Sequence, residues 1–102
     1  MAGISLEQLK ETPGARPGET HEHRIKRLAM RSMRRGIKEM DIILSRYADQ
    51  HLAAMSPDEL DHYEALLGEN DQDLYQWVSG QQDAPAQFAE LVARIAQHMR
   101  AR

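Results

Sequence analysis

Histidine is the side chain best suited to bind a metal ion or transfer a proton near neutral pH, and this chain has five histidines. Two of its five histidines, His21 and His23, stand two residues apart in the segment HEH. On a helix, side chains two positions apart point about 200° away from each other, so these imidazoles cannot bind the same metal ion. The other histidines occur singly, and no further ligand follows at the spacing of a zinc site. We therefore predict no metal site and no catalytic histidine.

The sequence motifs of enzymes are also missing. No serine lies in a nucleophile elbow, and no glycine-rich loop has the spacing of a nucleotide-binding site. The chain has no cysteine, which excludes disulfides, thiolate zinc sites and iron–sulfur clusters. Its 102 residues form one small domain, in which a large internal catalytic cavity is not expected. We expect a protein that is not an enzyme and holds no cofactor of its own.

The most unusual stretch is RSMRRGIKEMD, residues 31–41, in which Gly36 interrupts an otherwise helical pattern. One interpretation is that Gly36 is a left-handed C-cap, with the preceding arginines placed favourably against the carbonyl end of the helix dipole. The other is that its missing side chain allows another backbone to approach closely. Both interpretations place Arg35 and Glu39 on either side of an exposed corner, a shape suited to docking.

Helical periodicity defines the elements that must position this corner. Thr20 is the expected cap of a first helix that ends near Arg35, and a second runs from 37 to 51. Ser56, Pro57 and Glu59 mark the start of a third, which stops at Gly68. A fourth begins at Asn70 or Asp71, and a fifth extends from about 85 to 99. The expected core includes apolar side chains from every helix and, as filler, the methionines, among them Met30, Met33, Met40 and Met99.

The expected fold is all-α, a small compact bundle of about five helices preceded by an N-terminal arm. Strand patterns are absent from the sequence. Pro13, Gly14, Pro17 and Gly18 interrupt any helix near the N-terminus, so residues 1–19 are expected to be a flexible arm. Residues 20–102 then form the helical domain.

The net charge of −3 conceals two oppositely charged regions. Basic residues concentrate between His21 and Arg46, whereas positions 47–93 contain no lysine or arginine. Such a separation is typical of a protein that attracts an oppositely charged partner, although two solvated faces of a bundle would give the same pattern. The basic first helix leaves open a second function, a nucleic-acid-binding regulator or antitoxin-like protein. Against this alternative, no aromatic residues interleave with the basic ones.

Two motifs resemble those of a known family. The segment RLAMRSMRRGIKEMDIIL contains R-G-x-x-E at Arg35, Gly36 and Glu39, followed by Asp41, and LLGENDQDLYQWV lies downstream at 66–78. Together they resemble the succinate dehydrogenase assembly factors, small flavinators of proteobacteria and mitochondria. The resemblance covers about residues 24–99 and leaves out the arm.

This resemblance implies a five-helix protein that binds the flavoprotein subunit of succinate dehydrogenase, and in some relatives that of fumarate reductase. The implied task is to promote covalent attachment of FAD, which the partner carries. Arg35, Gly36 and Glu39 are then the centre of the partner-binding surface, with Arg34 and Asp41 at its rim. Tyr75 and Trp77 are weaker candidates, because a single Trp on an apolar helix face is usually packed in the core.

The cellular location is predicted from what the sequence lacks. No apolar run approaches the ~20 residues needed to cross a bilayer. The first residues, MAGISLEQLKETPGARPGE, have neither the apolar centre of a signal peptide nor the arginine-rich, acid-free character of a transit peptide. We therefore expect a soluble bacterial protein of the cytoplasm.

Overall fold

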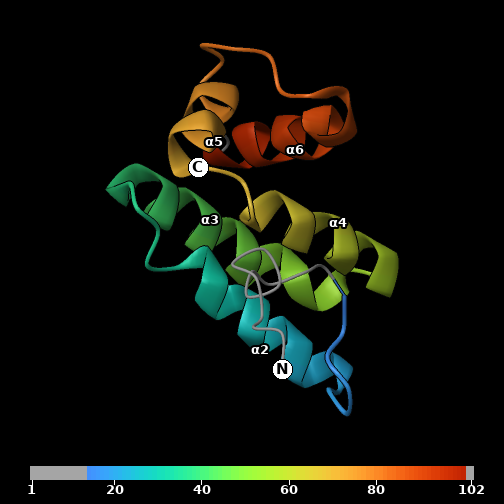
Figure 1. Ribbon diagram of the computed structural model, residues 1–102. Helices are drawn as coiled ribbons and strands as arrows, with labels where there is room; N and C mark the ends of the chain where they lie inside the picture. The colour runs from blue at the N-terminus through green and yellow to red at the C-terminus, as the bar shows by residue number, and fades with distance from the viewer. Residues whose placement is uncertain (1–13, 101–102) are drawn as a thin grey trace, which may run out of the picture.

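The computed structural model describes residues 14–100, which fold into an all-α bundle (Figure 1). Five α-helices follow one another in the described chain: α2 (His21–Ser32), α3 (Lys38–His51), α4 (Pro57–Leu67), α5 (Asp71–Val78) and α6 (Ala89–Arg100). Two short 3-10 turns, η1 (Leu52–Ala54) and η2 (Ala86–Phe88), lead out of α3 and into α6. The predicted bundle of about five helices is thus confirmed.

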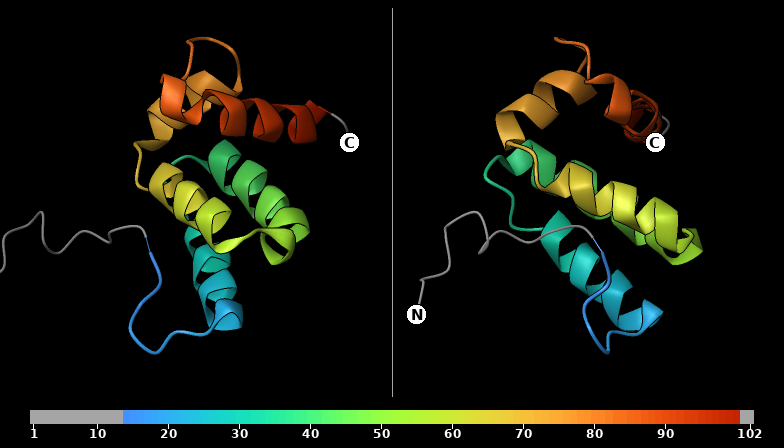
Figure 2. Two further views of the ribbon diagram at one scale, coloured as in Figure 1. Left: turned by 90° about the vertical axis from the view of Figure 1, so that its right-hand side faces the viewer. Right: turned by 45° about the vertical axis from the view of Figure 1, so that its right-hand side comes forward.

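The helices stack in three layers, which the two further views make clear (Figure 2). Helices α3 and α4 form the middle layer, α2 lies against one side of it, and α5 and α6 lie against the other. Helix α3 packs against α2, α5 and α6 and therefore connects the outer layers. The connection from α2 to α3 and the connection from α4 to α5 are the two corners that matter for the site.

Three of the predicted helix starts are confirmed by capping hydrogen bonds, whereas α6 begins at Ala89, after the 3-10 turn η2, rather than at about residue 85. The Thr20 side chain accepts a hydrogen bond from the His23 N–H at the start of α2. Ser56 and Glu59 form a reciprocal capping box at the start of α4, with Pro57 in the first turn. At α5 the cap is Asn70, whose side-chain oxygen accepts from the Gln72 N–H. Because these bonds satisfy backbone donors within a few residues, local sequence was enough to predict them.

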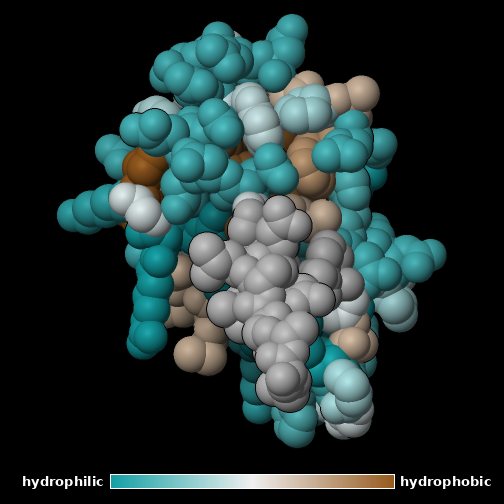
Figure 3. Space-filling view, viewed as in Figure 1, coloured by the Kyte–Doolittle hydropathy of each residue, from teal (hydrophilic) through white to brown (hydrophobic). Residues whose placement is uncertain are grey.

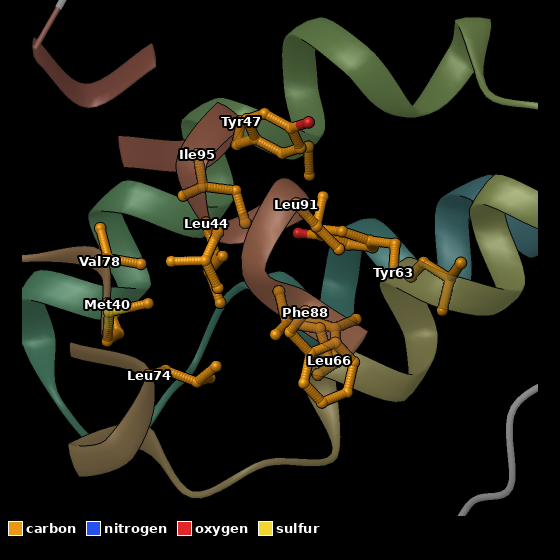
Figure 4. Close-up of a cluster of buried hydrophobic side chains, with 14 of the residues drawn as sticks. Met40, Leu44, Tyr47, Tyr63, Leu66, Leu74, Val78, Phe88, Leu91 and Ile95 are labelled. Carbon is orange, nitrogen blue, oxygen red and sulfur yellow. The ribbon is translucent and has the colours of Figure 1, made fainter. Parts of the chain in front are cut away.

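Most of the core lies between the middle layer and the layer of α5 and α6, where Figure 4 shows buried side chains from these helices. It contains the predicted apolar stripes of α3 to α6, of which Met40, Leu44, Tyr63, Leu66 and Leu74 are completely buried. Tyr63 also reaches α2, where its hydroxyl lies 2.7 Å from Ser32 Oγ. Two of the methionines expected in the core are instead at the surface, because 59% of Met30 and 47% of Met33 is exposed. Helix α2 buries a narrower stripe than its apolar residues suggest. The buried residues are Leu28 and the polar Arg24 and Ser32.

The end of α2 differs from the prediction. The helix stops at Ser32 rather than near Arg35, and residues 33–37 form an irregular connection to α3. The left-handed backbone conformation in this connection belongs to Arg34, with φ of 55°, while Gly36 has no positive φ. The interpretation of Gly36 as a left-handed C-cap is therefore wrong.

The chain just before α2 is held by an ionic cluster. Glu64, completely buried on α4, accepts hydrogen bonds from the Gly14 N–H at 3.2 Å and from Arg27 Nη1 at 2.7 Å. Arg27 also bonds Glu19 through Nε at 2.8 Å and the Gly14 carbonyl oxygen at 3.2 Å. Residues 14–19 of the predicted flexible arm are thus fastened to the bundle. Residues 1–13 lie outside the described part, and the domain boundary at residue 20 stays a prediction.

Candidate functional site

Arg35 directs its guanidinium group into the protein. Its Nε donates to Asp71 Oδ1 at 2.7 Å, while Nη1 and Nη2 donate to the carbonyl oxygens of Arg31 and Leu67, both at 3.1 Å. Only 10% of the Arg35 side chain is exposed. Charge-assisted bonds in such a shielded position are stronger than those at an open surface. Arg35 therefore joins the α2–α3 connection to the α4–α5 connection.

Gly36 lies beside the same carboxylate. Its backbone N–H donates to Asp71 Oδ2 at 2.7 Å, so one aspartate binds two consecutive residues through its two oxygens. A Cβ atom at position 36 would lie 3.1 Å from Asp71 Oδ2, which is closer than ordinary van der Waals contact. Glycine allows this approach, and the rest of the residue is exposed to solvent. The close approach thus comes from a side chain of α5, rather than from a backbone as the sequence suggested.

Glu39 is in the first turn of α3, one turn beyond Gly36, and is exposed. Within residues 14–100 its carboxylate has no hydrogen-bond or ion-pair partner. A carboxylate in this position interacts favourably with the helix dipole by ~0.3–1 kcal/mol at a surface. The fold therefore depends little on Glu39, and its charge remains available to a partner.

The two predicted rim residues lie in different surroundings. Arg34 is exposed on the connection between α2 and α3. Asp41 is half-buried and accepts a hydrogen bond from Ser45 Oγ at 3.3 Å, one turn further along α3. The structure thus gathers Arg34, Arg35 and Gly36 on one corner beside Glu39, while Asp41 is engaged within its own helix.

Glu39 also stands at one end of a shallow hollow with a volume of about 400 Å³. Helix α3 contributes one wall, α5 contributes Tyr75, and α6 contributes His98 and Met99. The wall from α3 contains Ile42, of which 44% is exposed, and ends at Arg46. We call this surface the α3–α5–α6 hollow; sequence reasoning did not find it.

The two weaker candidates on α5 differ in exposure to this hollow. Tyr75 lines it, whereas Trp77 does not. Trp77 is half-buried and its ring is nearly parallel to that of Phe88, with centroids 6.3 Å apart. It packs against the buried core, as predicted for a single Trp on an apolar helix face.

Asp71 is the residue that sequence reasoning missed. The sequence places it at the start of the fourth helix and within the second motif, without a role in the site. In the structure Asn70 caps α5, and Asp71 bonds Arg35 and Gly36. The signal that could have identified it is the presence of a carboxylate in the second motif and an arginine in the first, since the two form a charge-assisted pair.

The geometry can now be compared with known proteins. A family described as the flavinator of succinate dehydrogenase matches residues 26–99, which include both corners and the hollow. The chain belongs to this family. The resemblance inferred from the two motifs is thereby confirmed.

Similar proteins carry the name succinate dehydrogenase assembly factor 2, mitochondrial. One from Meyerozyma guilliermondii is 45% identical over 75 residues, covering 74% of this chain and 56% of the relative. Those of Candida glabrata and Lodderomyces elongisporus are 42% identical over 74 residues and 41% identical over 75, covering 72% and 74% of this chain. The matches cover 48% and 46% of those relatives, so the chain spans about half the length of the curated proteins it matches.

The expected bacterial, cytoplasmic location is contradicted by these names, since the relatives are fungal proteins described as mitochondrial. The prediction rested on the absence of apolar runs and on the absence of signal- or transit-peptide character in the first residues. Absences of this kind do not distinguish one aqueous compartment from another. Among residues 14–100, no helix is long and apolar enough to cross a membrane.

The alternative of a nucleic-acid-binding member gains no support from the basic helix α2. Its arginines turn toward acidic groups: Arg24 bonds Asp61 and Glu64, Arg27 bonds Glu19 and Glu64, and Arg31 lies 3.4 Å from Glu64. The hydrogen bond from Arg27 lowers the pKa of Glu19 to about 2. Burial acts to raise the pKa of Glu64, but hydrogen bonds from Arg27, Gly14 and Arg24 outweigh it and lower that pKa. These arginines stabilise the fold and do not form an open face for phosphates.

No metal-binding cluster of three His, Asp or Glu side chains occurs among the described residues. Three of the histidines, His51, His62 and His98, instead contact aromatic rings. His51 and His98 lie with ring centroids 5.1 Å apart, and both contact the Tyr47 ring. This group packs between α3 and α6 beside the α3–α5–α6 hollow.

Proposed function

We propose that this protein is an assembly factor that binds the flavoprotein subunit of succinate dehydrogenase and promotes covalent attachment of FAD to it. The observation that supports the proposal most strongly is the family match over residues 26–99. The names of the curated relatives agree with it. The flavoprotein subunit of fumarate reductase is a second candidate partner, by the same resemblance.

In this proposal the chain contributes no catalytic group and no cofactor. The partner carries both FAD and the histidine that becomes attached to it. The assembly factor stabilises the immature partner so that the histidine nitrogen and the flavin methyl carbon lie close and correctly oriented. Holding two reacting groups in this way lowers the entropic cost of reaching the transition state.

The proposed docking surface is the corner of Arg35, Gly36 and Glu39, with Arg34 at its edge. The three central residues act differently. Arg35 fixes the shape of the corner through Asp71, and Gly36 leaves an exposed surface without a side chain. Glu39 supplies a charge that pairs with no residue of 14–100. Asp41 contributes at the rim by bonding Ser45 and supporting the first turns of α3.

Binding to the apo-flavoprotein tests this function directly. The purified chain is titrated by calorimetry into the FAD-free flavoprotein subunit of succinate dehydrogenase, with a parallel titration into the mature, flavinylated subunit. We expect saturable binding to the immature subunit. If the chain binds neither the immature nor the mature subunit, the proposed function is contradicted.

A further inference from the structure

The outward face of α3 beside the docking corner carries an ordered stripe of side chains. Glu39, Ile42, Ile43 and Arg46 follow one another at spacings of three, one and three residues, which puts them on one face of the helix. This stripe is adjacent to the buried stripe that contains Met40 and Leu44. Helix α3 therefore has two apolar faces. One packs in the core, and the other lines the hollow between two opposite charges.

The two charged ends of the stripe are both free to act. Within residues 14–100, neither Glu39 nor Arg46 has a hydrogen bond or ion pair with another side chain, and both are exposed. They are separated by seven residues, or about 10 Å along the helix axis. The α3–α5–α6 hollow thus has a negative end at Glu39, a positive end at Arg46 and an apolar floor between them.

The apolar floor of the hollow differs from most of the protein surface because it exposes large apolar side chains. Among the described residues, Ile42 is one of three exposed large apolar side chains, with Met30 and Met33. Tyr75 and Met99 from the other helices line the same hollow and extend its apolar surface. In Figure 3 hydrophobic brown appears among hydrophilic teal near the start of α3, beneath α5, and also at other places on the same face. Exposed apolar surface enclosed by charges is typical of a site that a partner covers.

We propose that the α3–α5–α6 hollow binds a segment of the flavoprotein partner that carries a basic and an acidic side chain about 10 Å apart, with an apolar side chain between them. The basic group pairs with Glu39, the apolar group contacts Ile42, and the acidic group pairs with Arg46. This inference rests on the proposed function and adds the chemistry of the bound segment. It also makes Arg46 a specificity-determining residue, one that the family motif does not contain.

Charge complementarity is the reason to prefer such a segment over a uniformly charged one. A wholly basic segment would gain at Glu39 and be repelled at Arg46, and a wholly acidic segment would suffer the reverse. A wholly apolar segment would bury both charges without partners, which is costly. A segment with both charges in the matching order satisfies each end of the hollow.

Reversing each charge tests the proposal. The apo-flavoprotein subunit of succinate dehydrogenase is titrated with the unmodified chain and with Glu39→Lys, Arg46→Glu and Ile42→Ser variants. Each variant should bind about tenfold more weakly or worse, since a matched contact is replaced by repulsion or lost apolar contact. All three positions are exposed, so circular dichroism and thermal melts should stay close to those of the unmodified chain.

Lys26→Glu and Met30→Ser serve as matched controls, because they make the same kinds of change at exposed positions of α2 outside the hollow. Both should bind within about twofold of the unmodified chain. Tighter binding by Arg46→Glu would show that the segment bound in the hollow is basic. Tighter binding by Glu39→Lys would show that it is acidic. Either result overturns the inference. Unchanged binding by all three variants would do the same while leaving the proposed function intact. Failure of the unmodified chain to bind would instead reject the proposed function, and this inference with it.

Discussion

The carboxylate of Asp71, at the start of α5, holds the backbone of Gly36 by accepting its N–H at 2.7 Å. The same carboxylate accepts the Arg35 Nε at 2.7 Å. Because these residues are more than thirty positions apart in the chain, this contact joins the two motifs that identify the family. The shape of the proposed docking corner therefore depends on a residue that is remote in sequence.

Replacing Asp71 with Ala should destabilise the fold. Arg35 would lose its carboxylate partner while only 10% of its side chain is exposed, and such a loss typically costs about 1–3 kcal/mol. Each kcal/mol lowers the melting temperature by roughly 4–8 °C in a domain of this size. Asp73→Ala is the matched control, since Asp73 is an exposed acid in the same first turn. Equal thermal melts for the two variants would show that Asp71 acts only through the helix dipole.

Gly36→Arg should separate folding from function. The backbone at Gly36 has no positive φ, so a side chain there is not strained by the backbone, and only Asp71 must move slightly away from the added Cβ. The variant should remain folded by circular dichroism but fail to support covalent FAD attachment, because its side chain covers the corner. Gly36→Ala, with a far smaller side chain, should retain more of that function. A folded Gly36→Arg chain with normal function would remove the corner from the docking surface.

Glu64→Gln should be among the most destabilising substitutions in the chain. Glu64 is completely buried and bonds the buried Arg24 and the half-buried Arg27. Removing its charge takes a carboxylate partner from both cations and leaves Asp61 bonded to Arg24 and Glu19 bonded to Arg27. The expected loss is about 3–5 kcal/mol, measured by urea unfolding. Glu22→Gln, at an exposed ion pair with Lys26, should cost no more than about 1 kcal/mol. A small effect of Glu64→Gln would mean that the cluster is compensated elsewhere.

Stability should also fall in acid for a reason that can be traced to Glu19. Its pKa in the folded protein is about 2, below the value of ~4.3 expected in an unfolded chain. A carboxylate whose pKa is lower in the folded state stabilises the protein at pH values above its unfolded-state pKa. This stabilisation is lost as the pH falls toward 2. Melting temperatures measured from pH 7 to pH 2 should therefore drop below about pH 5. Glu19→Gln should make this drop smaller, and an identical pH profile would contradict the assignment.

Much of the fold could be predicted from sequence because its signals are local. Thr20, Ser56 and Asn70 cap helices through bonds that span two or three residues, and periodicity found the buried faces of α3 to α6. The early end of α2 and the exposure of Met33 could not be predicted in this way. The chain after α2 is held by bonds from Arg35 and Gly36 to Asp71, long-range contacts that local propensity does not contain.

The site was predicted in part for the same reason. The motif located Arg35, Gly36 and Glu39 on one corner, and the structure places them there. It could not show that Arg35 points inward while Glu39 stays free, nor that α5 and α6 complete a hollow beside Glu39. Those features arise only when the outer layer packs on α3.

Glu39→Ala should weaken binding without unfolding the protein. Its carboxylate has no partner among the described residues, so the melting temperature should change by only a few degrees. In a desolvated interface, the loss of a charged group typically costs 2–5 kcal/mol, which corresponds to roughly 30-fold weaker binding or more. Calorimetric titration of the apo-flavoprotein beside a thermal melt measures both quantities. Unchanged affinity would make Glu39 only a helix-dipole residue.

Covalent flavin attachment tests the central claim most directly. The apo-flavoprotein subunit is incubated with FAD, with or without this protein, then denatured and separated on a gel, where only covalently attached flavin still fluoresces. We predict a fluorescent flavoprotein band that forms markedly faster with the unmodified chain, and no acceleration with Gly36→Arg. Equal fluorescence with and without the chain would contradict the proposed function.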